Sequence, residues 1–183
     1  MSPSPPATYV VPCFDEAHRL RPEPFAALLA EPGLEVIAVD DGSRDGTRAI
    51  LEAIAAEHPG RMRVLALPDN VGKAEAVRAG MRQALAHGAA IVGYADADFA
   101  TPPEELVRLY QVLGRTGVEV VLGSRWLRLG ADIRRSELRH YAGRIFATVS
   151  ASTVGAPVYD TQCGAKLFRA SAALEAALAE PFA

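Results

Sequence analysis

An α/β fold with a mostly parallel central sheet is predicted by three features of the sequence. Short, almost uninterrupted apolar runs, typical of strands buried on both faces, alternate with segments that place apolar residues at helical spacing. Parallel strands need a crossover connection, usually a helix, so this alternation favours a parallel sheet covered on both faces. Each apolar run also ends in a polar cluster. Because ligands bind beyond the carboxyl ends of such strands, the clusters are expected to meet at one edge of the sheet.

The expected elements follow this alternation from the N-terminus. The polar, proline-rich residues 1–7 are expected to form a loose tail. Strands are expected at Thr8–Cys13, Leu34–Asp40, Arg63–Leu67, Ile91–Ala95, Glu119–Leu122 and within Asp160–Phe168. Helices are expected at Phe25–Ala30, after the Asp41–Thr47 turn, between Ala74 and Leu85, and at Leu106–Leu113, Ser136–Val149 and Ser171–Ala179.

Composition limits the class of protein. The chain of 183 residues suits a single domain, and its formal net charge of −3 gives no indication of a nucleic-acid partner. Cys13 and Cys163 lack metal-site spacing and no secretory signal is present, which favours reduced thiols in a cytoplasmic protein. No apolar run reaches about 18 residues, so no membrane span is expected. The chain stops at Ala183 without a tidy ending, and we expect that a C-terminal segment is missing.

The stretch Ile91–Glu105 carries the clearest chemistry. Asp96 and Asp98 follow the apolar strand, and Thr101 and Glu104 resemble a helix start with the threonine as N-cap. In an extended segment, residues i and i+2 point to the same side, so the two carboxylates are expected to face one site. Such a pair repels unless a cation compensates, and Mg²⁺ takes one or two carboxylates together with water and phosphate oxygens. The pair is therefore a candidate site for a divalent cation.

Three other phosphate-handling sites fit the sequence less well. A dinucleotide-binding fold would have a Gly-x-Gly-x-x-Gly turn after its first strand, and Pro12–Leu20 contains no glycine. A P-loop would need an upstream glycine and a Ser or Thr, which Gly72-Lys73 lacks. Phosphotransferases that use an Asp-x-Asp pair normally carry it at the first strand, with Thr or Val where this chain has Ala100. A sugar-nucleotide site fits best.

The sequence resembles a family 2 inverting glycosyltransferase of the GT-A fold, a Rossmann-like three-layer α/β sandwich. The resemblance extends from about Tyr9 to Phe168. The motifs that carry it are Val11–Glu16, Val39–Thr47, Asn70–Lys73, Asp96–Asp98 and Gly123–Arg125. Within the family, Asp160–Phe168 (DTQCGAKLF) is most similar to the dolichyl-phosphate β-glucosyltransferase branch, near the polyprenyl-phosphate mannosyltransferases.

The resemblance implies roles for individual residues. The nucleotide-sugar donor would be bound by Pro12, Phe14, Glu16, Asp41, Gly72, Lys73 and Asp96. Asp98, with Asp96 beside it, would hold Mg²⁺ or Mn²⁺ on the donor diphosphate and so stabilise the leaving group. Arg125 and Lys166 join these two aspartates in the set assigned to catalysis. The sequence departs from many relatives at Ala100, where they carry a glutamine that could bind the metal.

The acceptor implied by this branch is a polyprenyl or dolichyl phosphate. Arginine pairs with phosphate oxygens in bidentate fashion, and the candidate acceptor ligands are Arg134, Arg135, Arg139, Gln162 and Lys166. A phosphate monoester is largely dianionic near neutral pH because its second pKa is about 6, so it could attack without a general base. A solvated, basic helix start explains any single arginine equally well.

The prediction is therefore an enzyme that transfers a hexose, most simply glucose from UDP-glucose, to a polyprenyl phosphate with inversion. The alternatives are a GDP-mannose-dependent enzyme of the same kind, a transferase acting on a soluble glycan, and an inactive sugar-nucleotide-binding domain. The intact aspartate pair argues against the inactive domain. The fairly apolar Ala142–Val158 offers a peripheral contact with the inner face of a membrane, although a packed helix is the simpler interpretation.

Overall fold

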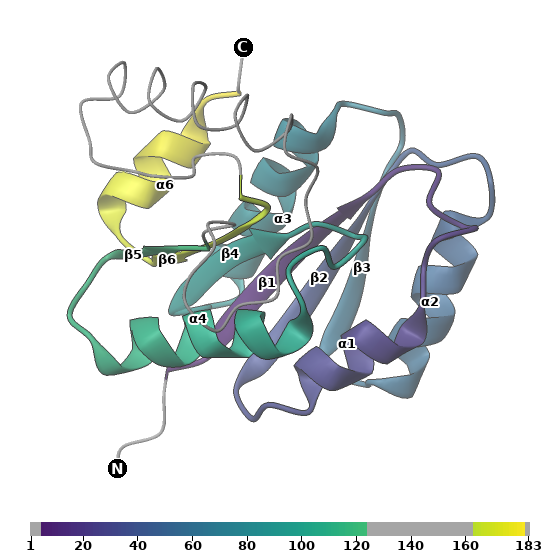
Figure 1. Cartoon of the computed structure of the whole chain (residues 1–183). Coiled ribbons are helices and arrows are strands. Elements are labelled where there is room, and N and C mark those ends of the chain that lie inside the picture. The colour runs from purple at the N-terminus through teal and green to yellow at the C-terminus, as the bar shows by residue number, and fades with distance from the viewer. Residues whose placement is uncertain (1–4, 124–162, 182–183) are drawn as a thin grey trace, which may run out of the picture. The chain divides into compact units, whose positions relative to one another are not determined.

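The computed structural model describes residues 5–123 and 163–181, and almost all of them belong to one compact unit (Figure 1). The strands are β1 (Ala7–Cys13), β2 (Leu34–Asp41), β3 (Met62–Leu67), β4 (Ile91–Ala95), β5 (Val120–Leu122) and β6 (Ala165–Arg169). The helices are α1 (Pro22–Leu29), α2 (Thr47–Glu57), α3 (Lys73–Ala86), α4 (Pro103–Arg115) and α6 (Ala172–Ala179). Strands and helices alternate from β1 to β5, as the sequence predicts.

The strands form one sheet in the order β3-β2-β1-β4-β6-β5. β1 is parallel to β2 and β4, and β2 is parallel to β3, whereas β6 is antiparallel to β4. The predicted mostly parallel α/β sheet is confirmed, and an antiparallel strand on such a sheet is a common variation. Because β2 and β3 extend from one side of β1 and β4 lies on the other, the strand order reverses between β1 and β4. Ligands of open α/β sheets bind beyond the strand ends at this kind of reversal.

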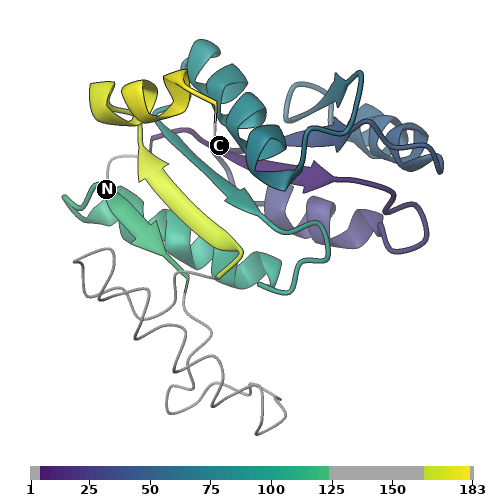
Figure 2. The ribbon, with the colours of Figure 1, turned by 90° about the horizontal axis from the view of Figure 1, so that it is seen from above.

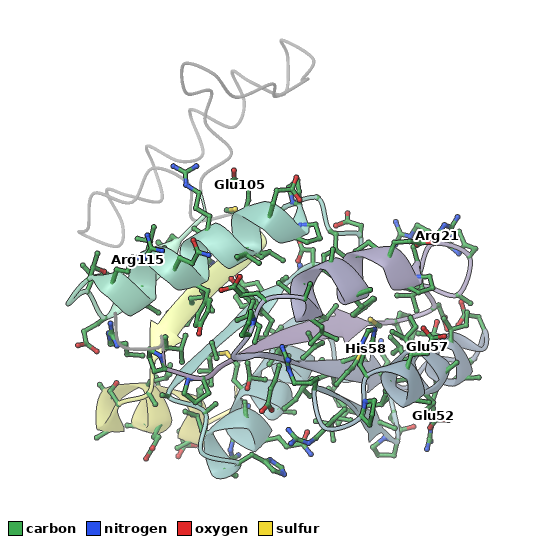
Figure 3. The ribbon with its side chains drawn as sticks, turned by 90° about the horizontal axis from the view of Figure 1, so that it is seen from below. Arg21, Glu52, Glu57, His58, Glu105 and Arg115 are labelled. Atoms are coloured by element: carbon green, nitrogen blue, oxygen red, sulfur yellow. The ribbon has the colours of Figure 1, made fainter. Side chains whose placement is uncertain are left out.

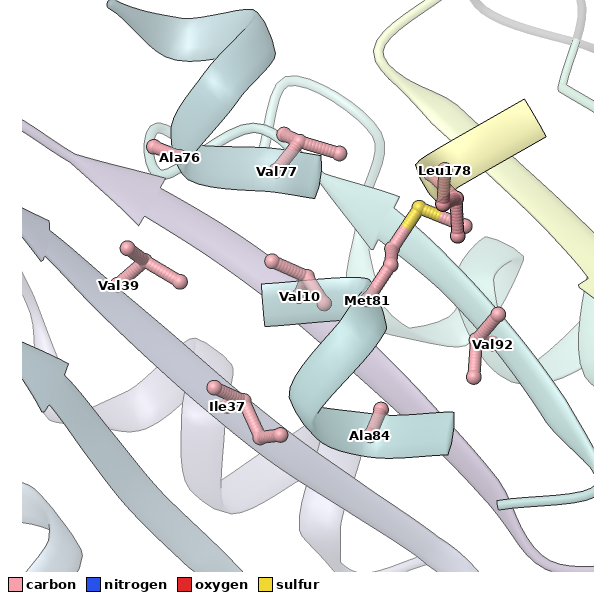
Figure 4. Packing of buried hydrophobic residues seen from close by; sticks show 9 residues of the cluster. All are labelled: Val10, Ile37, Val39, Ala76, Val77, Met81, Ala84, Val92 and Leu178. Atoms are coloured by element: carbon pink, nitrogen blue, oxygen red, sulfur yellow. The ribbon is translucent and has the colours of Figure 1, made fainter. Parts of the chain in front are cut away.

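Helices cover both faces of the sheet, giving three layers (Figure 2). α3 and α6 lie side by side over one face, and α1 and α4 lie side by side over the other. The core under α3 and α6 contains Val10, Ile37, Val39, Ala76, Val77, Met81, Ala84, Val92 and Leu178 (Figure 4). Gly80 allows α3 to approach the sheet, since a Cβ there would lie 2.5 Å from Cγ1 of Val10. The outer sides of the helices are charged, as Glu105 and Arg115 of α4 show (Figure 3).

A few polar side chains connect elements that are distant in sequence. The buried hydroxyl of Tyr9 in β1 donates a hydrogen bond to the carbonyl of Leu106 in α4 at 2.7 Å. The guanidinium of Arg61 donates to three carbonyls at the end of α1 and the start of β2, those of Leu29, Glu31 and Leu34. These bonds satisfy backbone acceptors where the helix ends, so they fix the connection between layers.

Most element boundaries differ from the prediction by a residue or more, and three of these differences have a clear physical cause. β1 begins at Ala7, whose side chain is buried, so the loose tail does not reach residue 7. α1 begins at Pro22 rather than Phe25, because proline suits the first turn of a helix, where its missing N–H is not needed. α4 begins at Pro103 with Pro102 as N-cap and has no side-chain cap, so the prediction of Thr101 as N-cap is wrong. The two consecutive prolines set the helix start one residue later.

Some predictions concern residues that the structure does not describe. The helix expected at Ser136–Val149 and the start of the Asp160–Phe168 segment lie outside the described residues. Within residues 5–123 and 163–181, no helix combines the length and the apolar character needed to cross a bilayer. Cys13 and Cys163 are both buried free thiols, in agreement with the prediction.

Candidate functional site

The carboxyl ends of β1 and β2 meet at one edge of the sheet, where hydrogen bonds join their loops. The N–H of Asp15 donates to Oγ of Ser43 at 3.1 Å, and the N–H of Arg44 donates to Oδ1 of Asp15 at 2.8 Å. The N–H of Glu16 donates to Oγ1 of Thr47 at 2.8 Å. The loop after β1 is therefore fixed on the loop after β2, and the predicted convergence of these polar clusters is confirmed.

The Asp45 carboxylate accepts hydrogen bonds that connect the loop after β1 with the first residue of α2. Its Oδ1 accepts hydrogen bonds from the hydroxyl and the N–H of Thr47, and its Oδ2 accepts one from the N–H of Ala17. The bond from the Thr47 hydroxyl is the largest cause that lowers the pKa of Asp45. The carboxylate therefore stays ionised, and keeps these bonds, at neutral pH.

Asp41 connects the end of β2 to the loop that precedes α3. It is 2% exposed. Its Oδ1 accepts a hydrogen bond from the N–H of Val71 at 2.8 Å and its Oδ2 accepts one from Gly72 at 3.0 Å. Gly42 allows the close approach of the two loops, because it has φ of 70° and a Cβ there would lie 2.6 Å from the backbone nitrogen of Asn70. Asp41 thus orders the loop into α3, and its contact with a nucleotide remains a prediction.

Asp96, directly after β4, has two close neighbours at its carboxylate. Its Oδ1 lies 2.5 Å from Nζ of Lys73, the first residue of α3. The second neighbour is Gly164, where a Cβ would lie 1.9 Å from Oδ2 of Asp96. The antiparallel register explains this proximity, since Ala95 faces Ala165 and the next pair along the register is Asp96 and Gly164.

The segment from Asp96 to Phe99 is a tight turn, so the prediction of an extended segment is wrong. The N–H of Phe99 donates to the carbonyl of Asp96 at 3.0 Å, and Phe99 has φ of 46°, in the left-handed region. Its ring packs edge-on against Phe25 of α1, with the centroids 5.0 Å apart and the planes at 81°. This aromatic contact offsets the free-energy cost of the unfavourable backbone conformation at Phe99. It also anchors the turn on α1, in the helical layer formed by α1 and α4.

Asp98 lies on the exposed side of this turn. Its Oδ1 accepts a hydrogen bond from the N–H of Ala100 at 3.0 Å. Arg19 lies within electrostatic reach: its hydrogen bond to Glu16 is the main cause that raises the pKa of Arg19, and the charge of Asp98 adds to it. The Glu16 carboxylate accepts bonds from Nε and Nη2 of Arg19. The two aspartates are therefore flanked by two cations, Lys73 and Arg19.

The two aspartates suit a divalent cation that shares its ligands with a substrate. Among residues 5–123 and 163–181, no group of three or more His, Cys, Asp or Glu side chains is placed to hold a metal ion. A cation held by Asp96 and Asp98 would need water or phosphate oxygens for its other positions, and this is the usual coordination of Mg²⁺. In kind and number, Asp96 and Asp98 match the protein ligands that Mg²⁺ takes when water and substrate oxygens fill its other positions.

A cavity of about 530 Å³ adjoins Lys73 between α3, β4, β6 and α6. Its polar lining comes from Lys73, Tyr94 and Lys166, and the ammonium of Lys166 lies 5.5 Å from the centroid of the Tyr94 ring. Apolar side chains, including Met81 and Phe168, line the rest. The volume is in the range of small-molecule sites. The structure thus places Lys166, one of the predicted catalytic residues, in the same cavity as Lys73.

The remaining predicted residues divide into two groups. Pro12 is half-buried in β1, Phe14 is 44% exposed at the end of that strand, and Gly72 is the N-cap of α3 with φ of 88°. They lie at the same edge of the sheet as Glu16, Asp41 and the aspartate pair, at strand ends or on the loops that follow. The second group falls outside the described residues and consists of Arg125, Arg134, Arg135, Arg139 and Gln162.

Comparison with known proteins gives the family. Residues 8–175 match the profile of glycosyl transferase family 2. The chain belongs to this family. It is 36% identical over 180 residues to the dolichyl-phosphate beta-glucosyltransferase ALG5C of Trichomonas vaginalis, covering 91% of this chain and 52% of that protein. It is 29% identical over 161 residues to the polyprenol monophosphomannose synthase of Mycolicibacterium smegmatis, covering 87% of this chain and 60% of that protein. The family 2 chain thus spans 52–60% of the length of these two relatives.

Solved structures of other glycosyltransferases share the fold. One is a mannosyltransferase from Pyrobaculum calidifontis in complex with GDP-Man and Mn²⁺, with a TM-score of 0.59, 22% identity, and coverage of 92% of this chain and 45% of that one. Another is glucosyl-3-phosphoglycerate synthase from Mycobacterium tuberculosis in complex with UDP, with a TM-score of 0.63, 21% identity, and coverage of 90% and 57%. The GT-A fold predicted from the sequence is confirmed.

Three residues of this site were not found by sequence reasoning. Gly164 borders the Asp96 carboxylate, Phe99 anchors the aspartate turn, and Arg19 binds Glu16 beside Asp98. Gly164 lies within the DTQCGAKLF motif and Phe99 directly follows the aspartate pair, so position in a motif was an available signal for both. For Arg19, the only signal in the sequence was its spacing of three residues from Glu16.

Proposed function

We propose that this family 2 chain transfers a hexose from a nucleotide diphosphate sugar to a polyprenyl phosphate, with inversion at the anomeric carbon. The observation that carries the proposal is the contact between Lys73 and Asp96 where the strand order reverses, with Asp98 two residues further along the same turn. It combines two carboxylates for a cation with an ammonium group for a phosphate. UDP-glucose is the donor we favour, because the relative that is 36% identical is a dolichyl-phosphate beta-glucosyltransferase.

The donor would lie along the sheet edge, from the end of β1 to the end of β4. The exposed ring of Phe14 offers a face for the base, with Pro12, Glu16 and Asp41 around the base and ribose. Gly72 and Lys73 would face the diphosphate at the N-terminus of α3, where backbone N–H groups and the helix dipole favour negative charge.

Departure of the nucleoside diphosphate is the step that these residues would assist. Mg²⁺ or Mn²⁺, held by Asp96 and Asp98, would supply positive charge to the diphosphate as the bond from the anomeric carbon to oxygen breaks. Lys73 would exchange its contact with Asp96 for a phosphate oxygen, and Arg125 would add a second cation. Lys166 would act from the cavity beside Lys73.

The acceptor phosphate would be the nucleophile. One of its oxygens forms the new bond to the anomeric carbon while the nucleoside diphosphate leaves from the opposite face with the electron pair of the old bond. Since the second pKa of a phosphate monoester is about 6, no general base is required near neutral pH. Arg134, Arg135, Arg139 and Gln162 would bind this phosphate. A lipid acceptor also implies peripheral contact with the inner face of a membrane.

A mannosyl version of the same reaction is the second candidate, because the mycolicibacterial relative is a polyprenol monophosphomannose synthase. The test is transfer of labelled hexose to a short polyprenyl phosphate in the presence of Mn²⁺, with the corresponding polyprenol as control acceptor. Glucose transfer from UDP-glucose, absent with polyprenol and lost in Asp98→Asn, is expected. Transfer only from GDP-mannose would establish the second candidate. Donor binding without transfer to any acceptor would overturn the proposal in favour of an inactive binding domain.

A further inference from the structure

We propose that Gly164 is a positioning residue of the donor site: the absence of a side chain at this position leaves the space that the Asp96 carboxylate occupies. The inference rests on the proposed function, because it concerns the carboxylate assigned to the metal and the donor. Gly164 is assigned no contact of its own with the metal or the donor; it acts through the position of the Asp96 carboxylate.

The Asp96 carboxylate occupies the space in which a side chain at position 164 would begin. A Cβ on residue 164 would stand 1.9 Å from Oδ2 of Asp96, 2.4 Å from its Cγ and 2.8 Å from its Oδ1. Oδ1 of Asp96 also contacts the ammonium of Lys73. The carboxylate thus contacts Lys73 and lies close to the backbone of residue 164, and the smallest side chain at position 164 would displace it.

The position of Gly164 follows from the strand pairing. β4 and β6 pair from Ile91 opposite Arg169 to Ala95 opposite Ala165, and the next pair is Asp96 opposite Gly164. The backbone of Gly164 is outside the left-handed region, so its conformation does not itself require glycine. Glycine is needed at position 164 because a side chain there would occupy the space of the Asp96 carboxylate. The neighbour that requires this glycine is therefore a candidate functional side chain and not a residue of the hydrophobic core.

Two other glycines serve as references for Gly164, one that strand pairing requires and one that tolerates a side chain. A Cβ on Gly93 would lie 2.0 Å from the backbone oxygen of Lys166, so alanine there would disrupt the pairing of β4 with β6. A Cβ on Gly117 would meet no atom within 4 Å, and its φ is ordinary, so alanine is tolerated. At Gly164 the obstacle is the end of one side chain, which can rotate away. Gly164→Ala should therefore fold while its Asp96 carboxylate is displaced.

The experiment compares wild type with Gly164→Ala, Gly117→Ala and Gly93→Ala, using thermal unfolding and calorimetric titration of Mn²⁺ in the presence of UDP. Gly164→Ala and Gly117→Ala should unfold close to wild type, and Gly93→Ala well below it. Changes to groups that orient metal ligands typically cost about 10–100-fold in metal affinity, and we expect a loss of this size for Gly164→Ala and none for Gly117→Ala. Asp96→Ala and Asp96→Ala/Gly164→Ala should bind Mn²⁺ equally, since Gly164 acts only through Asp96.

The outcomes separate this inference from the proposed function. If wild type binds Mn²⁺ and UDP but Gly164→Ala binds them as tightly, the positioning role is wrong and the proposed function stands. The role is also wrong if Gly164→Ala weakens binding further in the Asp96→Ala background. If folded wild type binds neither Mn²⁺ nor UDP, the proposed function fails, and the role of Gly164 in donor binding fails with it.

Discussion

The ammonium of Lys73 lies 2.5 Å from Oδ1 of Asp96, which joins the first residue of α3 to the residue that follows β4. The lysine side chain is 59% exposed and the aspartate side chain 30% exposed. Ion pairs this open to solvent contribute about 0–1 kcal/mol to the free energy of unfolding, so the Lys73–Asp96 pair adds little to the stability of the fold. It does place a solvent-exposed cation beside the carboxylate that we propose for the diphosphate and its metal.

Lys73→Met should separate these two roles. Methionine replaces the apolar stem of lysine and removes the ammonium group, so we expect a change in unfolding free energy below about 1 kcal/mol and a weaker affinity for UDP. Calorimetric titration of UDP and thermal unfolding of the free protein measure the two effects. An unchanged UDP affinity would show that Lys73 does not contact the diphosphate.

The turn that carries Asp98 depends on the contact between Phe99 and Phe25. Phe99→Ala keeps the unfavourable left-handed backbone, φ of 46°, but removes the ring that anchors it. An aromatic pair contributes about 0.5–1.5 kcal/mol beyond its buried area, so we expect a modest loss of stability and a clear loss of Mn²⁺ affinity. Phe99→Tyr, which retains the ring, is the matched control and should bind Mn²⁺ like wild type. Equal Mn²⁺ affinity in Phe99→Ala and Phe99→Tyr would contradict the anchoring role.

Arg61 should matter for stability far more than its neighbour Arg63. The Arg61 guanidinium donates to three backbone carbonyls, whereas Arg63 makes one partly exposed ion pair with Glu35. Hydrogen bonds to charged groups contribute about 1.5–3 kcal/mol each and are not additive, so we expect Arg61→Ala to lose about 3 kcal/mol. This corresponds to a fall of roughly 6–12 °C in Tm for a chain of this length. Arg63→Ala should lose less than about 1 kcal/mol, and equal losses would contradict the assignment.

Burial of Cys13 should make the protein less stable at high pH. Burial, assisted by the charges of Glu16 and Asp40, raises the pKa of the Cys13 thiol to about 12. The unfolded chain releases this proton near about pH 8.5, whereas the folded chain retains it up to about pH 12, so the unfolding free energy falls between these values by up to about 1.4 kcal/mol per pH unit. Urea unfolding at about pH 8 and about pH 10 should show a smaller decline for Cys13→Ala than for wild type. An equal decline in both proteins would contradict the raised pKa.

Much of the fold could be predicted because it depends on local patterns. Apolar runs such as Leu34–Asp40 became buried strands, and the polar clusters after them met at one edge because parallel strands end on the same side. The helix start at Pro103 was not predicted, because the spacing of Thr101 and Glu104 was interpreted as an N-cap at Thr101. The two consecutive prolines also constrain where a helix can begin.

The details of the site depended on contacts that a local pattern does not contain. The proximity of Gly164 to Asp96 follows from the register of two strands far apart in the sequence. The shape of the aspartate turn follows from a ring contact with α1. Likewise, the Asp40-Asp41 pair gives no sign that Asp41 is the residue that holds the loop before α3. Residue types could be predicted for these positions, but not their partners.

Thermal unfolding with UDP and Mn²⁺ tests the central claim, a metal-dependent nucleotide site at Asp96 and Asp98, most directly. A ligand at 100 times its Kd should add about 2.7 kcal/mol to the stability of the folded state, or roughly 5–10 °C in Tm. We expect this shift for wild type and for Glu57→Gln, which removes an exposed charge on α2, and its loss without Mn²⁺ or in Asp98→Asn. No shift with UDP or GDP in a cooperatively folded wild type, or an undiminished shift in Asp98→Asn, would contradict it.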